Sequence, residues 1–284
     1  MAMKILDVSK YQPTIDYAAC AKDIDGVILR CGLTYWGAQN KAADECFEKH
    51  YAGFKAAGVP VGVYYYSAAD SVEQAIAEAD KCLAIINGKQ FELPIYYDVE
   101  NNERQGKLGK EKLTAIVEAF CDRVEKRGYF VGYYSYTAWL QSKFDLAKLS
   151  KYTLWKADYR VLYDKKIACD MHQYTSSGKV AGINGRVDLS HCYKDFPSII
   201  KKAGLNGFSK SAVAQPVTKP VETVESLKVG DTVKVLKAVQ YDNGKAFRCW
   251  FSTYTVKQIK GNRVVIAKAG VTVAAVHKDN LQKV

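Results

Sequence analysis

The most informative segment of this chain is Leu93-Pro-Ile-Tyr-Tyr-Asp-Val-Glu100, in which two carboxylic acids follow a short apolar run. Short apolar runs rich in aromatic and β-branched residues favour buried β-strands. Asp98 and Glu100 are two positions apart, and side chains at that spacing on a strand point to the same side, with roots about 7 Å apart. The segment therefore predicts two carboxylates at a strand end, facing one cleft.

A pair of carboxylic acids in one cleft is an arrangement that cleaves glycosidic bonds. One carboxyl group stays protonated and assists the leaving oxygen, while an ionised partner stabilises the positive charge that develops on the sugar carbon. The chain contains no second Asp-x-Glu. Because the same spacing also occurs on solvated turns and in helix caps, the surrounding residues decide the interpretation.

Residues 1–203 alternate short β-rich runs with helical patterns, which is typical of βα units around a mainly parallel sheet. Helices are predicted at 44–57, 71–86 and 110–127, and from residue 130 onward the gaps between strands are too short for full helices. The predicted fold class is α/β, an irregular TIM-like (β/α) barrel with reduced helices. The eight predicted strands are residues 4–8, 26–30, 61–67, 94–98, 130–134, 153–157, 171–174 and 186–189.

Polar and aromatic residues recur where these predicted strands end. The carboxyl ends of parallel barrel strands form the active face, so we expect these residues to surround one site. Each alone has a simpler explanation, because a lone Asp often caps a helix and a lone Tyr often fills a core. The candidates are Asp7, Arg30, Tyr66, Asp98, Glu100, Tyr134, Trp155, Tyr159, Gln173 and Asp188.

The last quarter of the chain has a different pattern. Residues 204–226 lose periodicity and contain Pro216 and Pro220, which predicts an extended linker. Residues 227–284 consist of short β-branched runs separated by turns such as Gly261-Asn262, which predicts a small all-β barrel. The predicted domains are therefore 1–203 and 227–284, joined by the linker 204–226.

Positive charge is concentrated in this tail. Residues 205–284 carry 13 Lys and Arg against 5 Asp and Glu, which is +8 of the net charge of +11. A basic module favours polyanions such as wall teichoic acids or nucleic acid, and a solvated surface that aids solubility is the alternative. No nucleic-acid partner is predicted, because the basic residues are dispersed among the strands rather than gathered in one stripe.

The sequence lacks the features that several functional classes of protein require. No apolar stretch approaches the ~20 residues that span a bilayer, so no membrane insertion is expected. The first residues show no apolar core of signal-peptide length. The eight cysteines form no Cys-x-x-Cys and the four histidines lack ligand spacing, which predicts reduced thiols, no metal and no cofactor.

A series of motifs runs through residues 4–200. The motifs are Asp7-Val-Ser-Lys-Tyr-Gln12, Gly26-Val-Ile-Leu-Arg-Cys-Gly32, Asp44-x-x-Phe47, Ala57-Gly-Val-Pro-Val-Gly-Val-Tyr-Tyr-Tyr-Ser67, Tyr97-Asp-Val-Glu100, Leu154-Trp-Lys-Ala-Asp-Tyr159, His172-Gln-Tyr-Thr175 and Gly185-Arg-Val-Asp-Leu-Ser190. In their order and spacing, this region resembles glycoside hydrolase family 25, the lysozymes of phage endolysins and bacterial autolysins.

The resemblance implies hydrolysis of the β-1,4 bond between N-acetylmuramic acid and N-acetylglucosamine in bacterial peptidoglycan, on a barrel with fewer than eight outer helices. Glu100 would be the general acid, with a pKa raised by burial and neighbouring carboxylates. Asp98 would stay ionised, either as nucleophile or to orient the substrate's acetamido group for attack. Asp7 and Asp188 would complete the acidic site. The other rim residues would bind sugar: Arg30, Tyr66, Tyr134, Trp155, Tyr159 and Gln173.

The tail resembles bacterial SH3-like modules through Gly230-Asp-Thr-Val, Tyr241-Asp-Asn-Gly-Lys and Gly261-Asn-Arg-Val-Val-Ile. This resemblance implies a small all-β SH3-like barrel that binds the cell wall, with an anionic wall polymer as candidate partner. The start of the chain suits a phage endolysin that is made in the cytoplasm and reaches the wall after holin-type release. An autolysin exported by another route is the alternative.

Two other functions fit part of the sequence. A chitinase-like N-acetylglucosaminidase shares the acid pair, but a longer acidic signature would be expected before Asp98, where this chain is apolar. A non-catalytic glycan-binding protein of the cell wall would keep the groove without turnover, and the intact acids argue against it. Reducing-end analysis separates the two enzymes, since muramidase products end in N-acetylmuramic acid.

Overall fold

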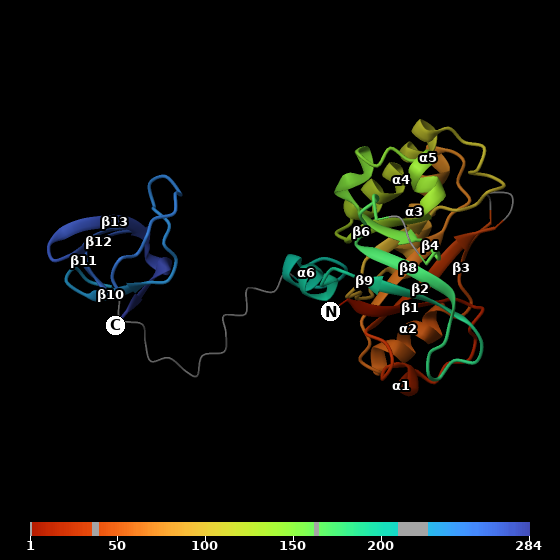
Figure 1. Ribbon diagram of the computed structural model, residues 1–284, viewed down its shortest axis with the longest axis horizontal. Helices are drawn as coiled ribbons and strands as arrows, with labels where there is room; N and C mark the ends of the chain where they lie inside the picture. The colour runs from red at the N-terminus through yellow and green to blue at the C-terminus, as the bar shows by residue number, and fades with distance from the viewer. Residues whose placement is uncertain (1, 36–39, 162–164, 210–226) are drawn as a thin grey trace. The chain divides into compact units, whose positions relative to one another are not determined.

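The computed structural model describes residues 2–35, 40–161, 165–209 and 227–284. The chain forms two compact units, residues 1–214 and 215–284, and each is described by itself (Figure 1). Most of the predicted linker 204–226 lies outside the described residues.

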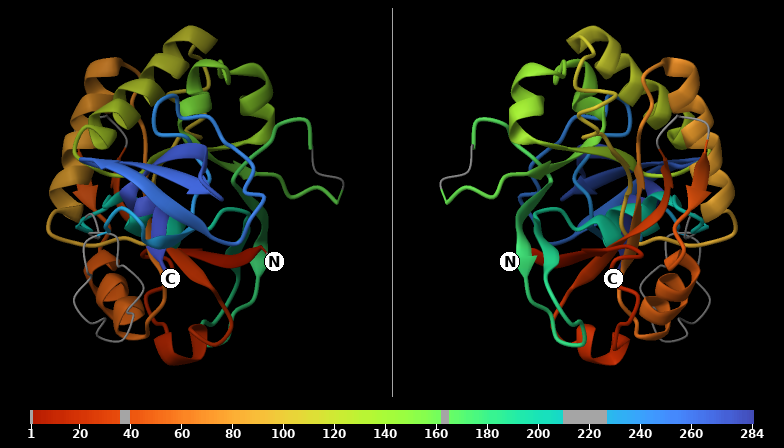
Figure 2. Two further views of the ribbon diagram at one scale, coloured as in Figure 1. Left: turned by 90° about the vertical axis from the view of Figure 1, so that its left-hand side faces the viewer. Right: turned by 90° about the vertical axis from the view of Figure 1, so that its right-hand side faces the viewer.

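The first unit is built on a closed sheet of eight strands, which follow one another in chain order around the barrel (Figures 1 and 2). The ring closes because β1 pairs with both β2 and β9. The predicted α/β fold with a closed barrel sheet is confirmed, and each strand overlaps the run that predicts it. The strands are β1 (Met3–Val8), β2 (Gly26–Thr34), β4 (Val61–Tyr66), β5 (Ile95–Asp98), β6 (Val131–Tyr136), β7 (Thr153–Ala157), β8 (Met171–Gly178) and β9 (Val187–Cys192).

Strand β9 departs from the predicted parallel arrangement. It runs antiparallel to both β8 and β1, because the connection 179–186 is too short for a crossover between parallel strands. Its first residues, rather than its last, therefore lie at the carboxyl rim of the barrel. Asp188, predicted near the carboxyl end of a strand, is instead the second residue of β9 and pairs with Asp7 at this rim. A short strand, β3 (Lys41–Ala43), pairs antiparallel with β2 outside the ring.

Helices cover the outside of the barrel (Figure 2). The predicted helices correspond to α2 (Phe47–Ala56), α3 (Val72–Ile86) and α4 (Lys110–Glu125). Between β6 and β9, the described residues form only α5 (Thr137–Ser142) and a 3-10 turn at Lys148–Lys151, so the later helices are reduced as predicted. The others are α1 (Tyr17–Cys20) and α6 (Phe196–Ala203). None of the helices in the described parts of the chain is long and apolar enough to cross a membrane.

Alternation along the strands sorts the side chains into an inner and an outer layer. In β5, Tyr96 points into the barrel and packs on Trp155, with ring centroids 5.3 Å apart. The next residue, Tyr97, points outward and stacks on Phe120 of α4 at 3.9 Å. Asp98 comes two positions after Tyr96, so the same alternation directs its carboxylate inward at the barrel mouth.

At the opposite end of the barrel, Asn206 binds backbone groups ahead of two strands, although the sequence pattern assigns this residue to the linker. After α6 the chain turns at Gly204, which has a left-handed φ of 66°. The buried Asn206 side chain donates to the carbonyl oxygens of Phe91 at 3.1 Å and Leu93 at 2.9 Å. Its Oδ1 accepts from the N–H of Phe130 at 2.6 Å. These backbone groups precede β5 and β6, so Asn206 is part of the first unit.

The second unit is an antiparallel sheet of five strands in the order β13-β12-β11-β10-β14, which confirms the all-β prediction. The predicted hairpin at Gly261-Asn262 joins β11 to β12, and Lys260 pairs with Arg263 beside the turn. Val233, Tyr254 and Ile266 contribute to its buried core. The strands are β10 (Thr232–Val235), β11 (Tyr254–Lys260), β12 (Arg263–Lys268), β13 (Val271–His277) and β14 (Leu281–Lys283).

Candidate active site

Four carboxylic acids meet at the mouth of the barrel. Asp7 comes from β1, Asp98 from the end of β5, Glu100 from the residues that follow β5, and Asp188 from the start of β9. They line a cleft of about 420 Å³. The full lining is Asp7, Val8, Ser9, Tyr11, Gln12, Arg30, Leu33, Tyr64, Tyr66, Asp98, Glu100 and Asp188.

The backbone around Asp98 explains why this acid and Glu100 share one cleft. Beyond the end of β5, the N–H of Val99 still donates to the carbonyl oxygen of Tyr134 at 3.0 Å. On the other side, the N–H of Ser67 donates to the carbonyl oxygen of Asp98 at 2.9 Å. Because both neighbouring strands hold this segment extended, the two acids keep the spacing that directs them to the same side.

Enclosure in the cleft changes the acidity of Glu100. Burial raises the pKa of Glu100 to about 7, and the nearby charge of Asp188 acts in the same direction. A carboxyl group with that pKa is substantially protonated at neutral pH and ready to donate. It therefore has the property required of a general acid.

The other acids are also enclosed. Burial raises the pKa of Asp98 well above its usual range, with Glu100 and Asp7 adding to the effect and Arg30 opposing it. The pKa of Asp7 is likewise raised, by burial and by Asp188. Close carboxyl groups cannot all ionise together, so the cluster shares its protons. The expected division into a protonated Glu100 and an ionised Asp98 therefore does not follow from the cleft alone.

Three of the predicted sugar-binding residues form one hydrogen-bonded group beside Asp7. The Gln173 amide donates to Asp7 Oδ2 at 3.0 Å. Its Oε1 accepts from the hydroxyl groups of Tyr134 at 2.9 Å and Tyr159 at 2.5 Å. Both tyrosines therefore fix the Gln173 amide so that its N–H points at Asp7. Tyr159 also lines a second pocket of about 290 Å³, together with Tyr136 and Arg160.

Trp155 lies deeper than the sequence pattern suggests. Its ring is inside the barrel and only 2% exposed, and its Nε1 donates to Ser190 Oγ at 3.0 Å. The indole packs on Tyr134, with centroids 4.7 Å apart, and on Tyr64 at 6.2 Å. Trp155 thus supports cleft residues from below, whereas Tyr66 and Arg30 lie on the cleft itself.

Arg30 is held by a residue outside the cleft. Its Nε donates to Asp44 Oδ2 at 2.7 Å, and both side chains are almost fully buried. Asp44 also accepts from the backbone N–H of Lys10 at 3.1 Å and of Cys46 at 2.9 Å. The guanidinium lies over the Tyr11 ring at 5.3 Å, and its buried Nη2 has no hydrogen-bond partner among the residues that the structure describes. Asp98 Oδ1 is likewise buried without a hydrogen-bond partner in the described parts of the chain.

A chain of buried polar side chains lies behind Glu100. Gln105 donates to Ser67 Oγ at 2.9 Å, Ser67 donates to the Tyr97 hydroxyl at 2.8 Å, and Tyr97 donates to Glu78 Oε2 at 2.6 Å. The N–H of Asn101, next to Glu100, donates to Gln105 Oε1 at 3.1 Å. This chain joins α3 to the segments that carry Tyr66 and Glu100.

The residues that sequence reasoning missed fall into two groups. Tyr64 is two positions before Tyr66, so strand alternation could have placed it on the same side; Tyr11 and Gln12 stand in the first motif. Glu78 and Gln105 carry no local signal, because their role depends on which segments meet in space. Within the described parts of the chain, no cluster of His, Cys, Asp or Glu could hold a metal ion.

Comparison with known proteins adds independent information on the barrel. The profile of the family described as Glycosyl hydrolases family 25 matches residues 6–183. Over 193 residues the chain is 28% identical to the autolytic lysozyme of Clostridium acetobutylicum, which covers 66% of this chain and 55% of that protein.

Two solved structures are similar to the same region. The modular autolysin LytC from Streptococcus pneumoniae, in complex with a synthetic peptidoglycan ligand, superposes with a TM-score of 0.59 and 29% identity, covering 68% of this chain and 47% of LytC. The catalytic domain of endolysin ply40 from bacteriophage P40 of Listeria monocytogenes superposes with a TM-score of 0.58 and 27% identity. The match covers 70% of this chain and 97% of the ply40 domain. The chain spans about half the length of the autolytic lysozyme and of LytC. With the profile matched across most of the barrel and more than half of the sequence, the chain belongs to glycosyl hydrolases family 25.

Proposed function

We propose that this protein is a lysozyme that hydrolyses the β-1,4 bond between N-acetylmuramic acid and N-acetylglucosamine in bacterial peptidoglycan. The observation that carries the proposal is the group of four acids in one cleft, in which Glu100 has a pKa of about 7. The activity named for the autolytic lysozyme and the peptidoglycan ligand of LytC support it.

In the proposed reaction Glu100 gives its proton to the glycosidic oxygen as the bond to the anomeric carbon breaks. The electrons for the new bond come from one of two sources. The substrate's acetamido oxygen attacks the anomeric carbon while its N–H donates to Asp98, or an Asp98 oxygen attacks directly and forms an ester. In either route water then attacks the anomeric carbon, the bond from that carbon to the acetamido or Asp98 oxygen breaks, and a proton from the water returns to Glu100.

Asp98 fits the first route, because its buried Oδ1 has no hydrogen-bond donor among the described residues, and a rotation of the carboxylate toward the cleft would let the acetamido N–H supply one. An incoming N–H also favours the ionised form of Asp98, which leaves the shared proton on Glu100. Peptidoglycan whose amino sugars have lost their acetyl groups separates the routes. Assisted attack requires the acetamido oxygen and stops on this substrate, whereas direct attack by Asp98 continues.

The decisive experiment is product analysis on purified peptidoglycan. We expect wild type to release fragments with N-acetylmuramic acid at the reducing end, and Glu100→Gln to lose at least about a thousandfold in rate with its fold intact. Glu103→Gln, an exposed acid three residues away, is the matched control and should retain full activity. Reducing ends of N-acetylglucosamine would instead assign the chitinase-like activity, and an active Glu100→Gln would remove the general-acid role.

For the rest of the chain we propose a wall-binding role. Residues 1–203, extended by the segment that carries Asn206, are assigned as the catalytic domain, the remainder of 204–226 as a linker and 227–284 as an SH3-like module that binds the cell wall, so the protein acts at the wall. The five-stranded antiparallel sheet and the basic charge of the tail support this assignment. Tethering raises the local concentration of the enzyme at its substrate even where the module binds weakly.

A further inference from the structure

The second unit exposes large aromatic side chains on a segment that belongs to no strand. Between β10 and β11, Trp250 is 69% exposed and Phe251 is 51% exposed. Scattered single apolar residues are normal on a protein surface, but two adjacent rings of this size are not explained by the core of this unit. The core uses other residues, among them Val233, Tyr254 and Ile266.

The chain fixes this segment at both ends. The N–H of Phe247 donates to the carbonyl oxygen of Ala238 at 3.0 Å. The N–H of Phe251 donates to the hydroxyl group of Tyr254 at 3.2 Å, and Tyr254 is only 1% exposed. The rings are therefore presented on an anchored backbone, which lowers the entropy lost when a ligand binds.

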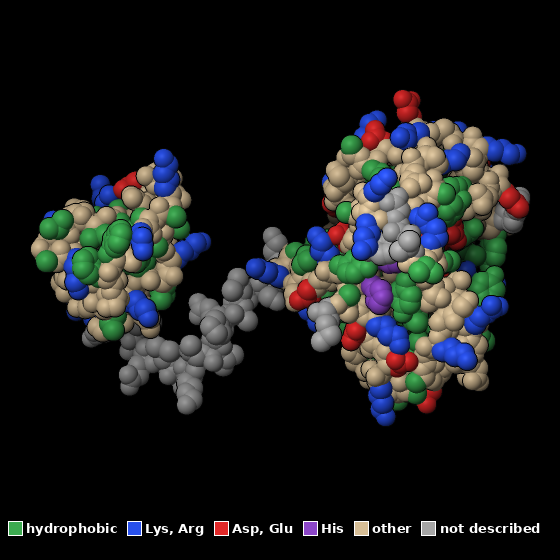
Figure 3. All heavy atoms as spheres, in the orientation of Figure 1, with side chains coloured by type: hydrophobic (Ala, Val, Ile, Leu, Met, Phe, Trp, Pro, Cys, Tyr) green, Lys and Arg blue, Asp and Glu red, His purple; other side chains and the backbone are tan. Residues whose placement is uncertain are grey.

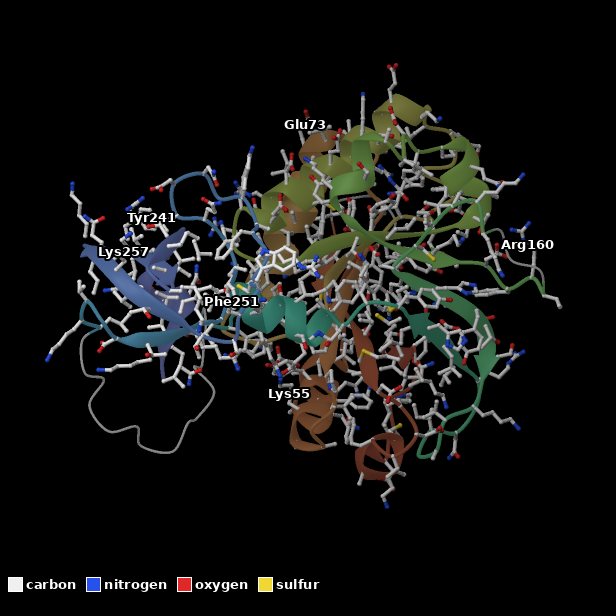
Figure 4. All side chains as sticks on the ribbon, turned by 60° about the vertical axis from the view of Figure 1, so that its left-hand side comes forward. Lys55, Glu73, Arg160, Tyr241, Phe251 and Lys257 are labelled. Atoms are coloured by element: carbon white, nitrogen blue, oxygen red, sulfur yellow. The ribbon has the colours of Figure 1, made fainter. Side chains whose placement is uncertain are left out.

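A cation lies against each ring. The Arg248 guanidinium is 4.4 Å from the centroid of Trp250, and Lys268 Nζ is 5.5 Å from the centroid of Phe251. These four residues are called the aromatic–cation patch. Tyr241, another half-exposed ring, lies away from Phe251 in the view of Figure 4 and stacks on His277 instead.

The second unit has many more basic than acidic residues, so its acids do not neutralise these cations. Residues 227–284 contain nine Lys and two Arg against three acids. Asp231 and Asp242 each pair with a cation outside the patch, Lys283 at 3.3 Å and Arg263 at 2.8 Å, and Asp279 lies beside the His277 ring at 3.4 Å. Basic side chains also surround hydrophobic patches on the face seen in Figure 3. The patch therefore lies in a positive field that attracts anions.

We propose that the aromatic–cation patch binds an anionic wall glycopolymer, in which sugar rings alternate with phosphodiester groups. Flat aromatic faces pack against sugar rings, and Arg and Lys beside them pair with phosphate oxygens. The choice of a wall polymer rests on the proposed function of the first unit. Single-stranded nucleic acid also combines stacking rings with phosphates, so it is included as a competitor in the test.

The test measures binding of the full chain to purified cell walls by sedimentation. All variants carry Glu100→Gln so that the walls stay intact. Walls are compared before and after hydrofluoric acid treatment, which cleaves phosphodiesters and removes the polymer. We expect the parent to bind treated walls about tenfold more weakly. The double variant Arg248→Glu/Lys268→Glu should bind native walls about tenfold more weakly than the parent and treated walls equally well.

The matched control is Lys260→Glu/Lys278→Glu. It makes the same charge change at the other end of β12, where Lys278 contacts Asn262 through its backbone N–H, and it should bind within about twofold of the parent. Trp250→Ala tests stacking without a charge change and should weaken binding to native walls about tenfold. Thermal unfolding of each variant checks that the substitutions, including the one at the half-buried Lys268, leave the fold unchanged.

Three results overturn the proposal. Equal loss in the control variant would assign the effect to bulk charge. Unchanged binding to treated walls would assign peptidoglycan itself as the ligand. An oligonucleotide that displaces the protein from walls as well as the purified polymer does would assign nucleic acid. These three binding results do not test catalysis. Catalysis is measured separately, as the fragments that the protein with Glu100 intact releases from treated walls.

Discussion

At the scale of single residues, the acid that fits the chemistry is also one that destabilises the fold. Burial raises the pKa of Glu100 from 4.5 to about 7. Above pH 4.5 the Glu100 carboxyl group ionises freely in the unfolded chain. In the folded protein it must either stay protonated or carry its charge in the enclosed cleft, and both cost free energy. Catalytic groups with shifted acidity commonly lower stability in this way.

This reasoning predicts that Glu100→Gln stabilises the protein at alkaline pH. The folded state binds the Glu100 proton more tightly than the unfolded state, so wild-type stability falls as pH rises from 4.5 to about 7. Glutamine has no such dependence. Urea unfolding should show a gain of about 1–3 kcal/mol at pH 8 and almost none at pH 4. An equal gain at both pH values would contradict the explanation; Glu103→Gln serves as control.

The same pKa predicts the alkaline limb of the activity profile. Proton donation requires the protonated form of Glu100, which disappears above pH about 7. The rate on soluble glycan fragments should therefore fall about tenfold per pH unit above that value. A plateau up to pH 9 would show that another group supplies the proton.

At the scale of elements, the direction of the buried hydrogen bonds behind the cleft is set by one carboxylate. Glu78 on α3 accepts from the Tyr97 hydroxyl at 2.6 Å and from the N–H of Ala68 at 3.1 Å. Because Glu78 accepts both, Ser67 is free to donate to Tyr97 and to accept from Gln105. Fully satisfied polar networks of this kind hold loops in one arrangement.

Glu78→Gln should therefore disturb Glu100 without touching the cleft. The glutamine amide places an N–H group against one of the two donors that Glu78 accepts, the Tyr97 hydroxyl or the Ala68 N–H. One hydrogen bond is therefore lost, and the segment after β5 is held less firmly. We expect kcat about tenfold lower, little change in KM and a shifted alkaline limb. Glu73→Gln, on the outer side of the same helix (Figure 4), should change none of these. A change in stability alone would reduce the role of Glu78 to packing.

The end of the barrel unit gives a second prediction at this scale. A chain that stops at residue 209 keeps Asn206. One that stops at 203 leaves three carbonyl oxygens, of Phe91, Leu93 and Gly128, and two N–H groups, of Phe91 and Phe130, without their partner. Each unsatisfied group costs about 1–3 kcal/mol, so the shorter chain should unfold at clearly lower urea concentration. Equal midpoints would mean that water replaces Asn206.

At the scale of the whole molecule, the two units have separate tasks under the proposed function. Removal of residues 210–284 should leave the rate on soluble peptidoglycan fragments unchanged, because the cleft lies entirely in the barrel. On whole cells the truncated chain should act about tenfold more slowly or worse, since tethering is lost. Turbidity of a susceptible cell suspension measures this difference. Equal lysis by both forms would remove the wall-binding role from the tail.

Much of this molecule follows from local pattern. The eight strands are predictable because alternation and run length are read over a few residues, and Asp98 and Glu100 share a side for the same reason. Strand order places Asp7 at the rim. By contrast, Trp155 follows the same strand-end pattern but is buried inside the barrel. The alternation of a strand shows which side a residue faces, but not how deeply it is buried or how large the neighbouring rings are.

The amino-acid sequence by itself determined the alternating strands and helices, the acid pair at the end of β5 and the basic, all-β tail. Tertiary structure alone decided the extension of β8 to Gly178, which leaves only a short connection to an antiparallel β9 and so brings Asp188 beside Asp7. It also decided the burial of Asn206 and the shared protons of the four acids. The reason is physical. Backbone preference acts between near neighbours in the chain, whereas burial, Coulomb interaction and hydrogen bonding act between groups that only folding brings together.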